Sequence, residues 1–268
     1  NYAWTWYQLP YGVIAVSLST TLLTELSDCA AREDWEGFLG FIRSGLRSTF
    51  FLIIPLALLV GALAQPLMQL FQAGAFTADE VNNVGSILAV WVLSLPFYAG
   101  YMYMYRVFAA LRSFLKFALI DFVVRFVQVA GYWYLCQPNV LGLAGIPVAD
   151  LGFYAVMFVV CSFIVRGKVG GYGNRGIVVM VVKTVVASVV GAVAAGVLAN
   201  GMGVLLAGVA ISAVVKAVAI LAVSGIVGLV VSFGLCKVLR VEEFAVLSRI
   251  GSKFAGKLGR GKKGNHAA

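Results

Sequence analysis

Residues 177–199 read IVVMVVKTVVASVVGAVAAGVLA, and residues 204–233 read VLLAGVAISAVVKAVAILAVSGIVGLVVSF. Both stretches are apolar on every face of a helix, and each is long enough to cross a bilayer, which takes about 20 residues. A transmembrane β-strand would instead alternate apolar and polar residues over about ten positions. The two stretches therefore predict α-helices that span a membrane.

The whole chain has the composition of a membrane protein. Of its 268 residues, 62% are hydrophobic and 12% are charged, and the mean hydropathy is +0.97. A soluble domain has roughly 45–50% apolar and about 25% charged residues, so a soluble core could not hold this much apolar surface. The length leaves room for about seven or eight spans with short loops, and for no large domain outside the membrane.

Seven spans follow from the hydropathy pattern along the chain. Their predicted limits are Trp4–Thr24, Ser48–Leu70, Val84–Met104, Leu115–Leu135, Gly142–Val165, Ile177–Ala199 and Leu205–Leu235. The predicted class is therefore all-α: a polytopic transmembrane helix bundle over residues 1–235, followed by a basic cytoplasmic tail over residues 236–268.

Lysine and arginine alternate between the loops. They follow the first, third and fifth spans and fill the tail, whereas residues 72–83, 136–141 and 200–203 contain none. Because basic flanks stay in the cytoplasm, this pattern predicts an N-terminus outside and a C-terminus in the cytoplasm. Asn1 is not an initiator methionine, and no signal peptide precedes the first span. We expect the chain to be the C-terminal part of a longer protein.

The net charge of +9 indicates contact with membrane lipid rather than with nucleic acid, because most basic residues fall in cytoplasmic loops and in the tail. The tail pairs an apolar row with a basic row at helical spacing: Phe244, Leu247, Ile250, Phe254 and Leu258 beside Arg249, Lys253 and Lys257. This pattern predicts an amphipathic helix lying on anionic lipid. The alternative is that the tail only enforces the topology and frays after Gly259.

Charged residues within the spans need a partner or a pathway, because a charge in hydrocarbon costs at least about 2.5–3.5 kcal/mol. Asp121 and Arg125 are four residues apart in the fourth span and can pair on one face, which Gln128 continues. They form either a self-neutralised anchor or a cationic lining for an anionic substrate. Asp150 in the fifth span has a role in a pathway or is satisfied by a contact between helices.

The first span is a polar helix that includes Thr5, Gln8 and Ser19. Proline within a span frees a carbonyl group and permits a bend where the helix faces protein or water. Hinge candidates in four spans therefore suggest a protein that moves: Pro10, Gly12, Pro55, Pro96 and Pro147. The last two spans carry ladders of small residues, whose usual meaning is close packing of helices: Ala187, Gly191, Ala195, Ser224, Gly228 and Ser232.

The sequence shows no constellation of an enzyme. The only histidine is His266 in the tail, no phosphate-binding glycine loop follows a strand, and the acidic residues do not cluster. The four cysteines lack the spacing of a metal site. We therefore expect no catalytic residue, no cofactor and no metal, which leaves transport, channel activity or assembly.

Two parts of the chain carry a resemblance to a known family. Residues 8–20 (QLPYGVIAVSLST), followed by Leu26-Ser27 and Gly45-Leu46-Arg47, resemble the eighth helix and following loop of the MviN/MurJ family. Pro66-Leu67 with residues 70–77 (LFQAGAFT) is similar to the turn between its ninth and tenth helices. The resemblance, which runs to the end of the chain, implies the C-terminal half of a fourteen-helix flippase of the multidrug/oligosaccharidyl-lipid/polysaccharide exporter superfamily.

The resemblance also implies a function: outward movement of lipid II, the lipid-linked peptidoglycan precursor, across the bacterial cytoplasmic membrane by alternating access. It implies the missing N-terminal half as a partner. The family's frequent arginine in the eighth helix falls at Thr5 and a nearby acidic residue falls at Gln8, so the headgroup site is neutral here. Asp150 is the one remnant of a sodium site that involves the seventh, eleventh and twelfth helices. Two alternatives remain: an exporter of another lipid-linked oligosaccharide or a drug, and a non-transporting membrane scaffold for cell-wall assembly.

Overall fold

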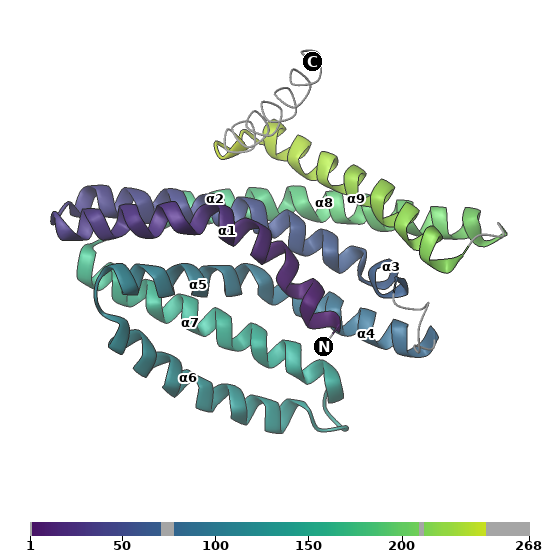
Figure 1. Cartoon of the computed structure of the whole chain (residues 1–268), viewed down its shortest axis with the longest axis horizontal. Helices are drawn as coiled ribbons and strands as arrows, with labels where there is room; N and C mark the ends of the chain where they lie inside the picture. The colour runs from purple at the N-terminus through teal and green to yellow at the C-terminus, as the bar shows by residue number, and fades with distance from the viewer. Residues whose placement is uncertain (1, 71–77, 209–211, 245–268) are drawn as a thin grey trace, which may run out of the picture.

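The computed structural model describes residues 2–70, 78–208 and 212–244, and these residues form an all-helical fold (Figure 1). Within them the elements are α1 (Tyr2–Ala31), α2 (Trp35–Ala62), α3 (Ala64–Gln69), α4 (Ala78–Trp91), the 3-10 helix η1 (Val92–Ser94), α5 (Leu95–Ala110), α6 (Phe114–Leu135), the 3-10 helix η2 (Gly142–Ala144), α7 (Gly145–Val169), α8 (Asn174–Ala207) and α9 (Ala213–Val238).

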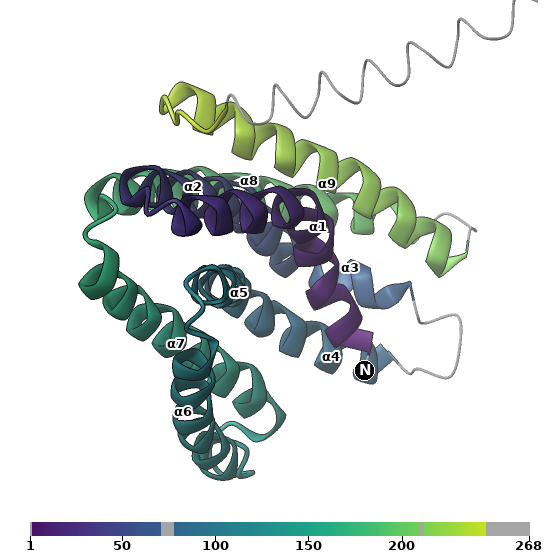
Figure 2. The same cartoon turned by 60° about the vertical axis from the view of Figure 1, so that its left-hand side comes forward.

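α2 forms the centre of the bundle. It packs against α1, α5 and α8, and its side chains Phe38, Ile42, Leu46 and Phe51 are fully buried. α9 covers α8, α7 packs against α5, and α6 lies outermost against α7 (Figure 2). The outward faces of α6, α8 and α9 carry large exposed apolar side chains, which suits a surface that meets lipid or another membrane segment rather than water.

Five stretches of the described chain are long and apolar enough to cross a membrane. They are Trp35–Ala62, Val81–Ala110, Gly142–Val169, Arg175–Leu206 and Ala213–Val238. α1 and α6, which also lie in predicted spans, are not among these five. α1 contains Pro10 within the helix, and α6 carries both Asp121 and Arg125. The protein is therefore a multi-pass membrane protein, whereas the count of seven spans stays a prediction.

Several predicted limits were wrong, and the second predicted span, Ser48–Leu70, runs past the end of α2 at Ala62 into α3. The predicted loop at residues 200–203 lies inside α8, and α9 begins at Ala213 instead of Leu205. A helix in apolar surroundings keeps its backbone hydrogen bonds internal, which outweighs the low helix propensity of asparagine and glycine. The third predicted span is two helices, α4 and α5, separated by η1 just before Pro96. Proline lacks the N–H that a continuous helix would use there.

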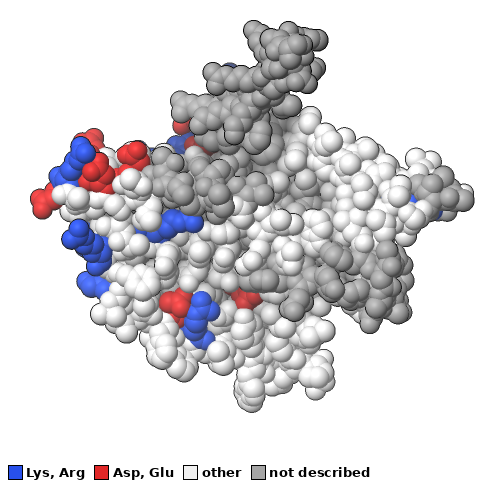
Figure 3. Space-filling model, in the orientation of Figure 1, with Lys and Arg blue, Asp and Glu red and all other residues white. Residues whose placement is uncertain are grey.

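The short turns after α1, α5 and α7 lie at the same end of the molecule as the C-terminal end of α9 (Figure 1). We call this the basic end and define it by the turns at residues 32–34, 111–113 and 170–173. Lysine and arginine gather there (Figure 3). Glu33 and Arg112 adopt the left-handed conformation, with φ of 58° and 51°, which closes two of these turns within three residues.

α8 and α9 pack closely through the ladder of small residues, as the sequence predicts. Gly191 and Ala195 of α8 and Ser224, Gly228 and Ser232 of α9 are all buried. A Cβ atom on Gly191 would lie 2.0 Å from Ser232 Oγ and 2.6 Å from the Gly228 carbonyl oxygen. The two backbones therefore approach closely enough that only glycine fits at this position.

Gly191→Ala should destabilise the protein by about 1–3 kcal/mol, because the added methyl group has to push α8 and α9 apart. Gly196→Ala, on the same helix, is the matched control. Nothing lies within 4 Å of its added Cβ, so it should be neutral or stabilise α8 by up to about 1 kcal/mol. Denaturant unfolding in detergent compares the two. Equal stability of both variants would show that the α8–α9 contact is looser than described.

Candidate functional site

Asp121 and Arg125 form an ion pair in the middle of α6. Arg125 Nε lies 2.7 Å from Asp121 Oδ2, which is the pairing that the four-residue spacing predicts. Tyr101 of α5 donates a hydrogen bond of 2.9 Å to Asp121 Oδ1. The Arg125 guanidinium also lies over the Phe153 ring of α7, 4.5 Å from its centroid. The pair is therefore held between three helices and balances its own charge.

Asp150 of α7 is 5% exposed and accepts hydrogen bonds from side chains of two other helices. Trp91 Nε1 of α4 donates to Asp150 Oδ2 at 2.8 Å, and Gln128 Nε2 of α6 donates to Oδ1 at 2.8 Å. The Tyr132 hydroxyl of α6 donates to the same Oδ1 atom. Three donors from two helices therefore converge on one carboxyl group of α7.

Gln128 joins the ion pair to the buried carboxylate. Its Oε1 atom accepts a bond of 3.5 Å from Arg125 Nη1, and its Nε2 atom also donates to the Tyr132 hydroxyl at 2.8 Å. Four residues singled out in the sequence, Asp121, Arg125, Gln128 and Asp150, thus lie in one connected set. We call it the polar network, and its members are Trp91, Tyr101, Asp121, Arg125, Gln128, Tyr132 and Asp150.

Sequence reasoning missed three members of the polar network: Trp91, Tyr101 and Tyr132. Tyr132 follows Gln128 by four residues, so the helical spacing that pointed to Gln128 could have reached it. Trp91 and Tyr101 lie on other helices, and no spacing within one helix indicates a contact between helices. Asp150 is satisfied by contacts between helices, which is one of its two predicted alternatives.

The polar network can bind an anion, but its side chains are not arranged for a covalent reaction. Asp121 and Asp150 have four carboxylate oxygens between them. Neutral side chains donate hydrogen bonds to three of these oxygens, and Arg125 pairs with the fourth. Within the described chain, no three His, Cys, Asp or Glu side chains gather as a metal site would require. The Arg125 side chain is 51% exposed, so its guanidinium can still bind an anion that comes from outside the bundle.

α1 places its polar residues on two faces. Thr5 and Gln8 are exposed, whereas Tyr7 is buried against α4. The Tyr7 hydroxyl lies 3.0 Å from Ser94 Oγ, and its ring stacks on Trp91 with 5.5 Å between centroids. One face of α1 therefore packs beside the polar network while the other carries Gln8. The side chain of Ser19 lies outside the described residues.

The five hinge candidates occupy different kinds of position. Pro10 and Gly12 lie in the N-terminal half of α1, which bends along its length (Figure 1). Pro55 is buried inside α2. Pro96 and Pro147 lie in the first turns of α5 and α7, where a missing N–H costs no helical hydrogen bond. The last two therefore mark the starts of helices.

Comparison with known proteins identifies relatives of the chain. The family model described as lipid II flippase MurJ matches residues 1–216. Lipid II flippase MurJ of Thermosipho africanus (strain TCF52B) is 34% identical over 114 residues, which cover 42% of this chain and 23% of that protein. Probable lipid II flippase MurJ of Rhizobium meliloti (strain 1021) is 32% identical over 91 residues, covering 34% and 17%.

A solved structure of lipid II flippase MurJ in an inward closed conformation has the same fold. The TM-score is 0.64 at 20% sequence identity, and the match covers 88% of this chain and 47% of the solved chain. The chain thus spans less than half the length of these relatives in each match. The family model nevertheless covers most of the chain, so the chain belongs to the MurJ family of lipid II flippases.

Proposed function

We propose that this chain is the C-terminal half of a lipid II flippase that works by alternating access in the bacterial cytoplasmic membrane. The family match over residues 1–216 carries the proposal. The structural match, which covers 88% of this chain but 47% of the solved one, supports a half-protein. Transporters built from two related halves hold their substrate where the halves meet. The N-terminal half would supply the second wall of that cavity.

We further propose seven spans, with the N-terminus outside and the C-terminus in the cytoplasm. The five apolar stretches together with α1 and α6 make up this count. Support comes from the basic end, where lysine and arginine of alternate turns gather (Figure 3). The polar residues of α6 have hydrogen-bonding partners inside the bundle, which lowers the cost of placing that helix in a membrane.

This topology predicts which residues an impermeant thiol reagent reaches. In a variant whose four native cysteines are replaced by alanine, Asn82→Cys should be labelled on intact cells. Glu36→Cys, at the basic end, should be labelled only after permeabilisation. Both positions are exposed, so access to the residue itself does not limit the reaction. The reverse labelling would contradict the proposed orientation.

The exposed face of α1 and the half-exposed Arg125 are the proposed contacts to the substrate. Thr5 and Gln8 lie three residues apart, which places them on one face of the helix. Neutral hydroxyl and amide groups can bind sugar and phosphate oxygens, more weakly than an arginine does. Asp121, Gln128 and Asp150 would act through Arg125 by holding its side chain in place.

Gln8→Leu should lower the rate of lipid II flipping by the complete two-half protein about two- to tenfold. That factor corresponds to the loss of one neutral hydrogen bond of about 0.5–1.5 kcal/mol. Membrane abundance should not change, because Gln8 is exposed. Gln65→Leu, an exposed glutamine on α3, is the matched control and should flip normally. A wild-type rate for Gln8→Leu at equal abundance would remove this face from the substrate path.

The neutral face of α1 also favours one alternative. Without charges at Thr5 and Gln8, the cavity could serve another lipid-linked oligosaccharide or a drug instead of lipid II. A reconstituted complete protein that flips such a substrate faster than lipid II would favour this alternative. If the complete protein binds cell-wall enzymes but flips neither lipid II nor the other substrate, it would be a scaffold.

We also propose the division into a bundle over residues 1–235 and a basic tail over residues 236–268 that contacts anionic lipid. Residues 245–268 lie outside the described chain. The start of the tail is held at the basic end: Arg47 of α2 pairs with Glu242 at 3.0 Å and with Glu243. Lys183 Nζ of α8 donates to the Leu239 carbonyl at 3.0 Å. These contacts would fix the direction in which the tail leaves the bundle, along the membrane surface.

A further inference from the structure

α7 and α8 follow one another in the chain but diverge from the turn that joins them (Figure 2). α7 packs against α5 and α6, whereas α8 packs against α2 and α9. Between them, next to the turn, lies a cavity of about 190 Å³, which we call the α7–α8 groove. One water needs about 10–15 Å³ of such space, so the groove admits a much larger ligand.

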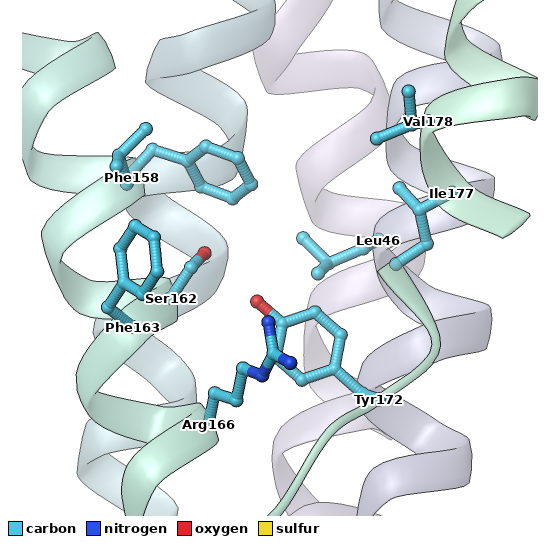
Figure 4. Close-up of a pocket in the computed structure, with 9 residues that line it drawn as sticks. Leu46, Phe158, Ser162, Phe163, Arg166, Tyr172, Ile177 and Val178 are labelled. Carbon is cyan, nitrogen blue, oxygen red and sulfur yellow. The ribbon is translucent and has the colours of Figure 1, made fainter. Parts of the chain in front are cut away.

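The walls of the α7–α8 groove are apolar. Phe158 and Phe163 of α7 form one side, Ile177 and Val178 of α8 form the other, and Leu46 of α2 closes the back (Figure 4). Phe163 is 67% exposed and Val178 is 58% exposed, so the groove opens onto the outer surface of the bundle. In a bilayer that surface meets acyl chains, and an acyl chain fits walls of this kind.

The end of the groove beside the turn is polar and basic. Arg166, Tyr172 and Ser162 converge there (Figure 4). Among the described residues, Arg166 takes part in none of the ion pairs. The Ser162 hydroxyl is shielded from solvent and, apart from an interaction with the Tyr172 hydroxyl, has no hydrogen-bond partner within the described chain. The position of the turn is fixed by Arg43, whose Nε donates to the Tyr172 carbonyl at 2.9 Å.

Each of these three side chains can donate a hydrogen bond to an anion. Burial raises the pKa of the Tyr172 phenol above its ordinary value, so the phenol stays protonated. Arginine presents a planar fork of donors that matches phosphate oxygens. None of the residues that line the groove is acidic. The chemistry at this end therefore complements a phosphate that carries a net negative charge.

We propose that the α7–α8 groove binds one anionic glycerophospholipid of the surrounding membrane, with its phosphate at Arg166, Tyr172 and Ser162 and an acyl chain between α7 and α8. A lipid in this place would fill the space that the diverging helices leave open. The site lies at the basic end, where the headgroups of the proposed cytoplasmic leaflet would meet the protein. It is separate from α1 and the polar network.

The test introduces a fluorescent reporter into the wall of the groove by Phe163→Trp and follows its quenching by lipids with brominated acyl chains. The full chain is held in phosphatidylcholine nanodiscs, and the signal is taken relative to the parent without the substitution. Brominated phosphatidylglycerol should quench at a mole fraction about tenfold lower than brominated phosphatidylcholine. Adding Arg166→Gln should raise the phosphatidylglycerol midpoint about tenfold or more, as expected for loss of a charge-assisted hydrogen bond.

Lys168→Gln is the matched control for the loss of charge. It lies two residues further along α7, and its Nζ atom donates to Ser113 Oγ instead of facing the groove. The midpoint should stay within about twofold. If Lys168→Gln and Arg166→Gln had equal effects, general surface charge would explain the binding, and the proposal would be overturned. So would equal quenching by the two brominated lipids, or displacement of phosphatidylglycerol by lipid II at a lower concentration.

Discussion

Asp150→Leu should destabilise the chain by several kcal/mol and leave much of it unfolded in the membrane. The substitution removes an acceptor from three buried or half-buried donors, on Trp91, Gln128 and Tyr132. Each buried donor left without a partner costs about 1–3 kcal/mol. A typical domain is stable by only about 5–15 kcal/mol in total, so the loss is a large share.

Thermal unfolding in detergent and the amount of folded protein in membranes measure this effect. Asp150→Asn keeps one carbonyl acceptor in the same place and should lose less stability than Asp150→Leu. Asp28→Leu is a control, because Asp28 forms an exposed pair with Arg32 that contributes about 0–1 kcal/mol. If Asp150→Leu were as stable as Asp28→Leu, the polar network would not hold α4, α6 and α7 together.

Much of the fold could be predicted from local patterns in the sequence. The apolar runs gave the helices, and the ladder of Gly191, Gly228 and Ser232 gave the close contact of α8 with α9. The spacing of Asp121 and Arg125 gave their ion pair. All of these signals depend on residues within one helix or on a general property of apolar segments, which is why the sequence alone carries them.

Contacts between distant helices could not be predicted in the same way. Trp91 and Asp150 are 59 residues apart, and only the packing of α4 against α7 brings them together. The end of α8 was also missed, because Asn200, Gly201 and Gly203 favour a turn in water. In apolar surroundings the unpaired backbone of a turn costs more than the weak helix propensity of these residues.

The α7–α8 groove was likewise invisible to sequence patterns. In the sequence, Arg166 is one more basic residue at the end of a predicted span, where lysine and arginine are common. Only the divergence of α7 and α8 sets its guanidinium beside Tyr172 and Ser162 at the end of an apolar space (Figure 4). The proposed substrate face on α1 had a stronger signal, because polar residues in a predicted membrane helix are unusual.

Our central proposal makes this chain one half of a lipid II flippase that would need the other half to work. A cavity between two halves would have only one wall in this chain alone, and its polar face would meet lipid or collapse. This chain alone should therefore give no flipping, and the N-terminal half of the Thermosipho africanus relative alone should give none. The two together should restore it.

Outer-face exposure of lipid II, in cells depleted of their own flippase, measures this most directly. The Thermosipho africanus relative divided at the corresponding point is the control for assembly of two separate halves. We expect lipid II to be exposed by both combined pairs and by neither half on its own. Exposure of lipid II by this chain alone would contradict the proposal. So would an inactive pair that contains this chain, if the divided control is active.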